Sequence, residues 1–76
     1  MKEKILVVDD EKEIADLIEV YLQNENMEVY KFYTGKDALA CIEKVDFDLA
    51  ILDIMLPDED GLSILKRLRT RADTQK

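Results

Sequence analysis

The sequence predicts an α/β fold in which three parallel strands alternate with three helices. Two short apolar runs, at residues 4–8 and 47–52, have the composition of buried parallel strands. After each strand, apolar residues recur at the spacing of one helix face, which gives the order β-α-β-α-β-α. Short connections between alternating elements favour right-handed crossovers and a parallel sheet. A chain of 76 residues without an internal repeat or linker is expected to form one small domain.

The first half of the chain contains two predicted strands and the helix that joins them. Residues 4–8 (KILVV) are apolar between charged neighbours and predict the first strand. Residues 11–24 place apolar side chains at i, i+3, i+4, i+7 and i+8, which predicts an amphipathic helix. Asp10, with Glu13 three residues later, has the spacing of a capping box at the start of this helix. Residues 27–32 alternate well enough to predict the second strand.

The middle of the chain repeats this pattern with a shorter helix. Thr34 and Asp37 have capping-box spacing, and the apolar residues that follow, up to Val45, predict the second helix. Residues 47–52 predict the third strand, and its last four residues are apolar on both faces.

The third helix is predicted from Leu62 and fades near Thr70, with residues 71–76 as a frayed tail. Residues 66–76 carry five basic side chains and one acidic side chain, a net charge of +4. We interpret these charges as the solvated end of a helix, where the helix dipole favours cations. A nucleic-acid contact is the alternative interpretation, although nothing in the sequence resembles a DNA-reading helix.

The rest of the chain is strongly acidic. Residues 1–65 carry 17 acidic and 6 basic side chains, a net charge of −11, within a total of −7 for the whole chain. This surface disfavours nucleic-acid binding and favours a cation or a basic partner.

No apolar run is long enough to span a membrane, and no signal-peptide pattern is present. Cys41 is the only cysteine and histidine is absent, which predicts a cytoplasmic protein without disulfides, with Cys41 as a small core residue.

Three carboxylates follow the two most apolar strands at their carboxyl ends. Asp9 and Asp10 come directly after residues 4–8, and Asp53 comes directly after residues 49–52. Open α/β sheets bind their ligands at this end of the strands. If the two strands are neighbours, about 4.8 Å apart, the three carboxylates can share one cation. Oxygen ligands without histidine or cysteine select Mg²⁺, with Mn²⁺ or Ca²⁺ as alternatives, and their repulsion raises at least one carboxyl pKa without metal.

Each acidic residue also has a simpler interpretation. Asp10 alone is of the residue type most common at a helix N-cap. Asp58, Glu59 and Asp60 are expected to form a solvated loop with one helix cap rather than a metal site. The joint pattern is more specific than its parts, because one strand ends in Asp-Asp, a second ends in Asp, and Pro57 follows four residues later.

The segments around these carboxylates form a composite motif: Ile5–Glu11 (ILVVDDE), Leu49–Pro57 (LAILDIMLP) and Gly61, with support from Gly35–Leu39 (GKDAL). Together they resemble the receiver domain of bacterial two-component response regulators. The resemblance covers about residues 3–70 and is closest to receivers of transcriptional regulators with a winged-helix output domain. It implies a flavodoxin-like doubly wound parallel sheet with the strand order 2-1-3.

The resemblance also implies a role for each carboxylate. Asp53 would accept a phosphoryl group from the phosphohistidine of a partner histidine kinase. Asp10, with Asp9 acting through water, would hold Mg²⁺, and the backbone carbonyl of Met55 would be a further ligand. The chain would be a signalling module with self-catalysed phosphoryl acceptance, not a turnover enzyme. An acidic metal-dependent hydrolase is a weaker alternative, because the sequence offers no general base beyond the same carboxylates.

The family's fold has five strands and five helices, whereas this sequence supplies three of each. The family's Ser or Thr after strand 4, its Lys after strand 5 and its aromatic switch residue have no counterpart. We therefore expect a single truncated receiver domain, residues 1–76, whose third strand lies at an edge. Leu49–Leu52 is then expected to pair with the same strand of a second copy, giving a homodimer with a six-stranded sheet. The alternative function is a half-receiver that keeps an acidic metal pocket and does not signal.

Overall fold

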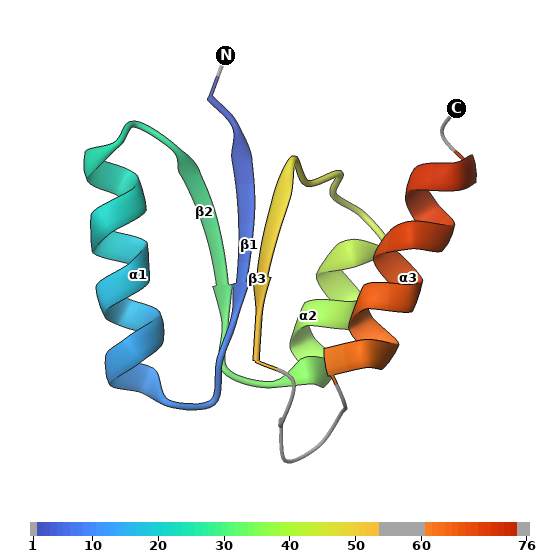
Figure 1. Ribbon diagram of the computed structural model, residues 1–76, viewed down its shortest axis with the longest axis horizontal. Coiled ribbons are helices and arrows are strands. Elements are labelled where there is room, and N and C mark those ends of the chain that lie inside the picture. The colour runs from blue at the N-terminus through green and yellow to red at the C-terminus, as the bar shows by residue number, and fades with distance from the viewer. Residues whose placement is uncertain (1, 54–60, 75–76) are drawn as a thin grey trace.

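Three parallel strands form the centre of the molecule, in the order β2-β1-β3 (Figure 1). The computed structural model describes residues 2–53 and 61–74, and for residues 71–74 it describes the backbone only. The strands are β1 (Lys4–Val8), β2 (Glu28–Phe32) and β3 (Leu49–Leu52). The predicted fold class and strand order are confirmed, including the adjacency of the two most apolar strands, β1 and β3.

Helices cover both faces of the sheet, with one helix on one side and two on the other (Figure 1). They are α1 (Lys12–Asn24), α2 (Gly35–Ile42) and α3 (Gly61–Thr74). None of the helices in the described ranges is both long and apolar enough to cross a membrane.

The central strand β1 supplies side chains to two separate apolar clusters, because successive side chains of a strand point to opposite faces. The cluster beneath α1 contains the buried residues Ile5, Val7, Ala15 and Leu22. The cluster beneath α2 and α3 contains the buried residues Leu6, Val8, Ala38, Ile42 and Ile64. Each fully buried aliphatic side chain contributes roughly 1.5–3 kcal/mol, so β1 is the strand that holds the two layers of helices together.

The strand register brings the carboxyl ends of all three strands to one level. Val8, the last residue of β1, is paired with Phe32 on one side and with Leu52 on the other. The residues that follow β1 and β3 therefore leave the sheet at neighbouring points, and this edge is where the candidate site lies.

The start of α1 differs from the prediction. The N-cap is Glu11, which makes no side-chain capping bond, so the proposed capping box of Asp10 and Glu13 is wrong. Instead, the backbone N–H of Glu11 donates to Asp9 Oδ1 at 3.0 Å. A short side chain can accept a bond from the backbone two residues later, and this local turn leaves the Asp10 carboxylate outside the helix cap.

The cap of α2 was predicted correctly. Thr34 is the N-cap in extended conformation, and its Oγ1 accepts the backbone N–H of Asp37 at 3.2 Å. Cys41, in the last turn of this helix, is only partly buried, and desolvation raises the pKa of its thiol.

Other element boundaries also differ from the prediction: α2 ends at Ile42 rather than at Val45, and β2 begins at Glu28 rather than at residue 27. β3 begins at Leu49 rather than at residue 47, because both the side chain and the backbone of Asp48 form hydrogen bonds with the first residue of β1. Lys4 N donates to Asp48 Oδ2 at 2.8 Å, and Asp48 N donates to the Lys4 carbonyl oxygen at 2.8 Å. At the other end of the chain, α3 continues to Thr74 instead of fading near Thr70, since Arg and Ala extend a helix without needing an apolar stripe.

Candidate functional site: an acidic cluster at the strand ends

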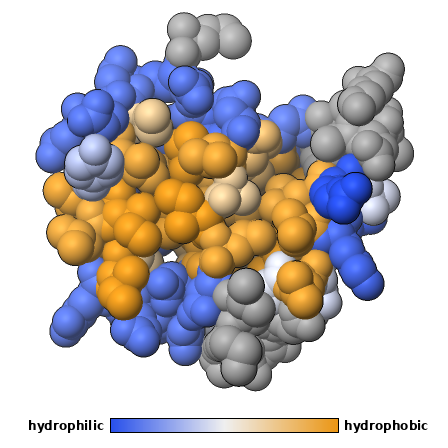
Figure 2. Space-filling view, viewed as in Figure 1, coloured by the Kyte–Doolittle hydropathy of each residue, from blue (hydrophilic) through white to orange (hydrophobic). Residues whose placement is uncertain are grey.

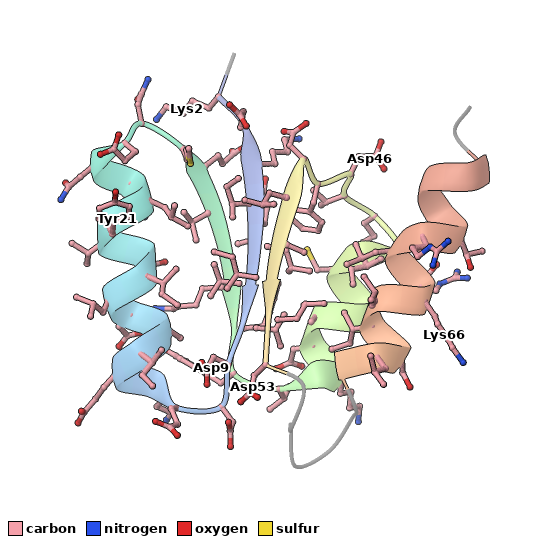
Figure 3. All side chains as sticks on the ribbon, viewed as in Figure 1. Lys2, Asp9, Tyr21, Asp46, Asp53 and Lys66 are labelled. Atoms are coloured by element: carbon pink, nitrogen blue, oxygen red, sulfur yellow. The ribbon has the colours of Figure 1, made fainter. Side chains whose placement is uncertain are left out.

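Asp9, Asp10 and Asp53 meet at the carboxyl edge of the sheet, where β1 and β3 end side by side. The backbone N–H of Asp53 donates to the carbonyl oxygen of Val8 at 2.9 Å, and that of Asp9 donates to Phe32 at 3.1 Å. Both bonds continue the strand ladder past the last strand residue, so the backbones that carry the carboxylates are fixed. Figure 3 shows Asp9 and Asp53 at this common end of the strands.

The three carboxylates are close enough to hold one ion. One oxygen atom from each lies within 4.8 Å of one from each of the others. Asp9 and Asp53 are partly buried, whereas Asp10 is exposed. Two oxygens on opposite sides of a Mg²⁺ ion are about 4.2 Å apart, which is twice a Mg–O distance of about 2.1 Å, and Ca²⁺ allows a slightly wider spacing. The oxygen-only donor set suits a hard divalent cation, and its spacing of up to 4.8 Å matches the span of Ca²⁺ and would contract slightly around Mg²⁺.

The surroundings of Asp10 in this cluster raise the pKa of its carboxyl group. The pKa of Asp10 is raised above 3.8, first by desolvation, then by a hydrogen bond with the side chain of Asp53, and further by the negative charges of Asp53 and Asp9. A hydrogen bond between two carboxyl groups needs one shared proton, and a bound cation could take the place of that proton. The direction is the one expected for crowded carboxylates, although desolvation and not repulsion is its first cause.

The structure brings the three predicted aspartates together, and their roles as phosphoacceptor and metal ligands stay predictions. Met55, whose carbonyl was predicted to bind the metal, lies outside the described residues. So do Pro57 and the acidic residues at positions 58–60. Gly61 is described, and it is the buried first residue of α3.

One group of side chains beside the site was missed by the sequence reasoning. Lys31 lies in β2, and its ammonium forms ion pairs with Asp16 at 2.6 Å and with Glu19 at 2.9 Å, both on α1. No direct signal for this contact is present in the sequence, because it joins residues 15 and 12 positions apart on two different elements.

The basic residues of α3 have a structural partner in at least one case. Arg67 Nε lies 2.5 Å from Glu43 Oε1, and Arg67 Nη2 donates to Glu43 Oε2 at 2.6 Å. This two-point contact joins α3 to the end of α2, and the hydrogen bonds and charge of Glu43 raise the pKa of the Arg67 guanidinium. The structure therefore gives part of the basic segment a packing role, in line with the interpretation as an exposed helix face.

Comparisons with known proteins converge on one family. The model of the response regulator receiver domain matches residues 5–76. The regulatory protein VanR of Enterococcus faecium is 61% identical over 71 residues, which are 93% of this chain and 31% of VanR. VanRc of Enterococcus gallinarum is 59% identical over 69 residues, which are 91% of this chain and 30% of VanRc. The chain thus spans about a third of the length of these relatives.

Solved structures agree with this result. A CheY-like response regulator receiver domain from Methanospirillum hungatei has a TM-score of 0.88 and 38% identity, covering 95% of this chain and 58% of that one. The response regulator TrrA of Thermotoga maritima, solved in complex with Mg²⁺ and BeF, has a TM-score of 0.85 and 38% identity, covering 96% of this chain and 63% of that one. The chain therefore spans somewhat less than two thirds of the length of these structures.

Proposed function

The chain belongs to the family of response regulator receiver domains, and on that premise we propose that Asp53 accepts a phosphoryl group from a histidine kinase. The observation that carries the proposal is the meeting of three carboxylates, with oxygens within 4.8 Å of one another, at the ends of β1 and β3. Asp53 is the one member of this cluster that β3 supplies. It is also partly buried, with its backbone bonded to β1, so its carboxylate is held in one place for attack.

The neighbouring aspartates are suited to a different role from that of Asp53. Asp9 Oδ1 already accepts the backbone N–H of Glu11, which orients this carboxylate toward the strand end. Asp10 is exposed and lies against Asp53. We assign both to Mg²⁺, with Asp9 acting through water and with the carbonyl of Met55 as a further ligand. Mn²⁺ and Ca²⁺ have the same preference for oxygen and are alternatives.

A divalent cation at this position would neutralise charge on the phosphoryl oxygens and so reduce their repulsion from the carboxylates. The residues of the chain then contribute position: Asp53 as nucleophile, with Asp9 and Asp10 beside it at fixed distances. The structure of TrrA with Mg²⁺ and BeF supports the assignment, because that protein is 38% identical to this chain. We infer self-catalysed phosphoryl acceptance within a two-component system, rather than turnover of a substrate.

The experiment that tests this function is phosphorylation of the purified chain by acetyl phosphate in the presence of Mg²⁺. The expected result is a mass gain of one phosphoryl group that depends on the metal and disappears in Asp53→Asn. Glu13→Gln, which removes an exposed charge on α1, is the matched control and should retain the gain. Labelling that persists in Asp53→Asn would assign the phosphate to another residue and exclude the proposal.

A second candidate function follows from the outer side of β3. In the described part of the chain β3 pairs only with β1, and Leu49 is 54% exposed. Figure 2 shows apolar side chains gathered over the face that runs from α1 across the strands to α3. Such an edge can pair with another strand. We infer that a second copy would pair with it in antiparallel orientation about a two-fold axis, giving a homodimer.

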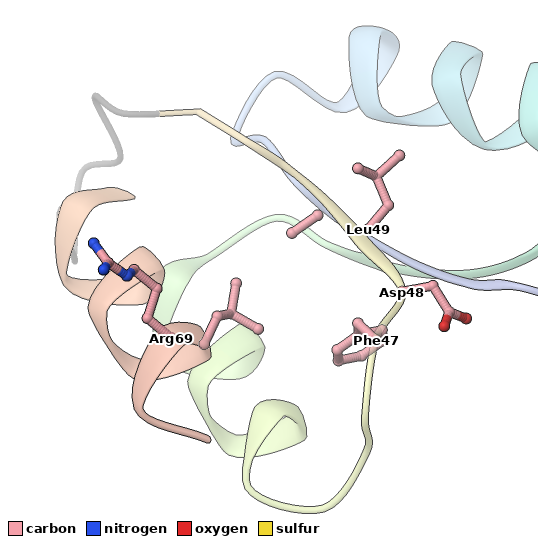
Figure 4. Close-up of a pocket in the computed structure, with 6 residues that line it drawn as sticks. Phe47, Asp48, Leu49 and Arg69 are labelled. Carbon is pink, nitrogen blue, oxygen red and sulfur yellow. The ribbon is translucent and has the colours of Figure 1, made fainter. Parts of the chain in front are cut away.

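A groove beside β3 supports self-association. It has a volume of about 220 Å³ and lies between β3 and α3, and Figure 4 shows Phe47, Asp48, Leu49 and Arg69 along it. Four of its six lining residues are apolar, so a second copy that covered the groove would remove apolar surface from water. In this candidate function the dimer keeps the acidic pocket and binds metal without taking up phosphate. Metal binding with no mass gain from acetyl phosphate would favour it over phosphoryl acceptance.

A further inference from the structure

A polar network ties the first turns of α1 to the end of β2, on the opposite side of β1 from Asp53. Lys31 Nζ donates to Asp16 Oδ1 at 2.6 Å and to Glu19 Oε1 at 2.9 Å. The hydroxyl of Tyr33 donates to the same Asp16 oxygen at 2.7 Å. A lysine and a tyrosine from the strand side thus share acceptors on two successive turns of the helix.

The ring of Tyr33 extends this network to the first residue of the helix. The ammonium groups of Lys12 and Lys31 each lie 5.3 Å from the centroid of the ring. A cation within about 6 Å of an aromatic face is attracted by the ring. Lys12 is the first residue of α1, so Tyr33 connects the end of β2 with the start of α1 directly.

These contacts enclose the short segment that contains two of the three carboxylates. At one end of the segment, the Asp9 N–H donates to the carbonyl oxygen of Phe32 at 3.1 Å, and Phe32 lies between Lys31 and Tyr33 in the chain. At its other end, the segment enters α1 at Lys12. Residues 9–11 connect the end of β1, beside Phe32, to Lys12 at the start of α1. The network therefore fixes the positions of these two ends relative to each other.

We propose that Lys31, Tyr33 and Asp16 are positioning residues for the carboxylates of Asp9 and Asp10. The inference rests on the proposed function, since it concerns how tightly this site holds Mg²⁺. None of the three network residues belongs to the carboxylate cluster. They act by holding the start of α1 against β2, which limits the directions in which the two carboxylates can point. Residues that do not bind the metal themselves can raise its affinity by holding the ligands in the binding geometry. The ligands then lose less conformational entropy when the metal binds.

The network is better suited to this role than an isolated surface ion pair. The side chain of Lys31 is only 18% exposed, and its ammonium has two carboxylate partners on the helix. Exposed single pairs hold geometry poorly, because both long side chains must be ordered for one contact. Here Tyr33, which is uncharged, adds a hydrogen bond to Asp16 and ring contacts with Lys12 and Lys31.

The test compares Mg²⁺ affinity and amide hydrogen exchange in Tyr33→Phe with those in the wild-type chain. Tyr33→Phe removes the hydroxyl and keeps the ring, and Tyr21→Phe removes the same group from an exposed position on α1 as a control. The expected result is a Mg²⁺ dissociation constant about tenfold higher in Tyr33→Phe, the lower end of the effect of outer contacts on metal sites. Lys31→Met should weaken binding similarly, and Lys31→Arg should retain it.

Exchange in the metal-free chain reports on position separately from metal binding. The amide of Glu11 is bonded to Asp9 Oδ1, so its exchange rate reports where the Asp9 carboxylate points. We expect faster exchange of the Asp9 and Glu11 amides in Tyr33→Phe, with no change for Leu6 and Val7 in the centre of β1. Equal acceleration along β1 would overturn the inference, because the network would then stabilise the fold without positioning the site.

The outcomes separate this inference from the proposed function. Unchanged affinity and exchange in Tyr33→Phe, in a chain that still takes up phosphate at Asp53, overturn the positioning role alone. Weaker Mg²⁺ binding in Tyr33→Phe, in a wild-type chain that takes up no phosphate, overturns the proposed function and leaves the positioning role standing. A wild-type chain that binds no Mg²⁺ overturns both.

Discussion

The backbone N–H of Asp53 donates to the carbonyl oxygen of Val8 at 2.9 Å, one residue beyond the last paired residues of β1 and β3. This bond links the strand that carries Asp53 to the strand that carries Asp9 and Asp10, immediately before the point where the carboxylates meet. The spacing between the backbones of Asp9 and Asp53 is therefore set by the sheet. A site built on a parallel ladder is well ordered before any ligand arrives, which is the condition for phosphoryl transfer by positioning.

Mg²⁺ is expected to stabilise the wild-type chain, because it binds a cluster that exists only in the folded state. At a Mg²⁺ concentration 100 times the dissociation constant, the free energy of unfolding should rise by about 2.7 kcal/mol. In Asp10→Asn this gain should be much smaller, since one ligand is lost. Thermal melts with and without Mg²⁺, followed by circular dichroism, measure both values.

The same variant makes a second, opposite prediction in the absence of metal. Desolvation, the hydrogen bond with Asp53 and the negative charges of Asp53 and Asp9 all raise the pKa of Asp10 and so oppose its ionisation. Asp10→Asn removes the desolvated charge and its repulsion, so its melting temperature in EDTA at pH 7 should be higher than that of the wild type. A melting temperature that falls in EDTA would show that Asp10 supports the metal-free fold and would contradict this prediction.

Asp16 gives a prediction for the dependence of stability on pH. Its carboxyl pKa is lowered below 3.8, first by the hydrogen bond from Lys31, then by that from Tyr33. A depressed pKa in the folded state adds stability that is present above the unfolded value and is lost as the pH falls through the folded value. Asp16→Asn should therefore melt below the wild type at pH 7, and the difference should shrink as the pH is lowered below about 3.8. A difference that is constant across this range would assign the effect to packing.

The N-cap of α2 allows a measurement of local stability far from the acidic cluster. Thr34 Oγ1 accepts the N–H of Asp37 at 3.2 Å, and Thr34→Ala removes that acceptor. The expected cost is about 1 kcal/mol in the free energy of unfolding, whereas Thr34→Ser should cost little, because serine is an equally good cap. Urea denaturation of the two variants provides the comparison. Equal losses in both would show that the threonine methyl group, and not the cap, carries the effect.

Much of this architecture could be predicted from the sequence because it depends on patterns that repeat along the chain. The apolar run that ends at Val8 and the one that ends at Leu52 showed which strands are buried, and the aspartates after them marked the site. The start of α1 could not be predicted in the same way. Asp9 and Asp10 are both capable of capping, and only the backbone geometry shows that Asp9 accepts the N–H of Glu11.

The contacts between elements were the least accessible from sequence. Lys31 binds Asp16 and Glu19, which precede it by 15 and 12 residues, so the pairing depends on how α1 packs against β2. The later start of β3 has a similar origin. The side chain of Asp48 accepts a hydrogen bond from the backbone N–H of Lys4, which lies 44 residues earlier in the chain. Hydrophobic periodicity reports which face of an element is buried, and it does not report which polar groups meet across the boundary.

Self-association through β3 is tested by a charge at its exposed edge. Leu49 is 54% exposed and lines the groove beside α3, so Leu49→Lys places an ammonium where two copies would meet. If the homodimer forms, the wild type should sediment as a dimer at high concentration and Leu49→Lys as a monomer, because burying an unpaired charge is costly. Gln23→Lys is the control, since Gln23 is an exposed polar residue of α1, and it should leave the dimer intact. A wild-type chain that is monomeric at every concentration and melts cooperatively excludes the dimer, and phosphorylation of Leu49→Lys by acetyl phosphate then shows whether the acidic site works in a single copy.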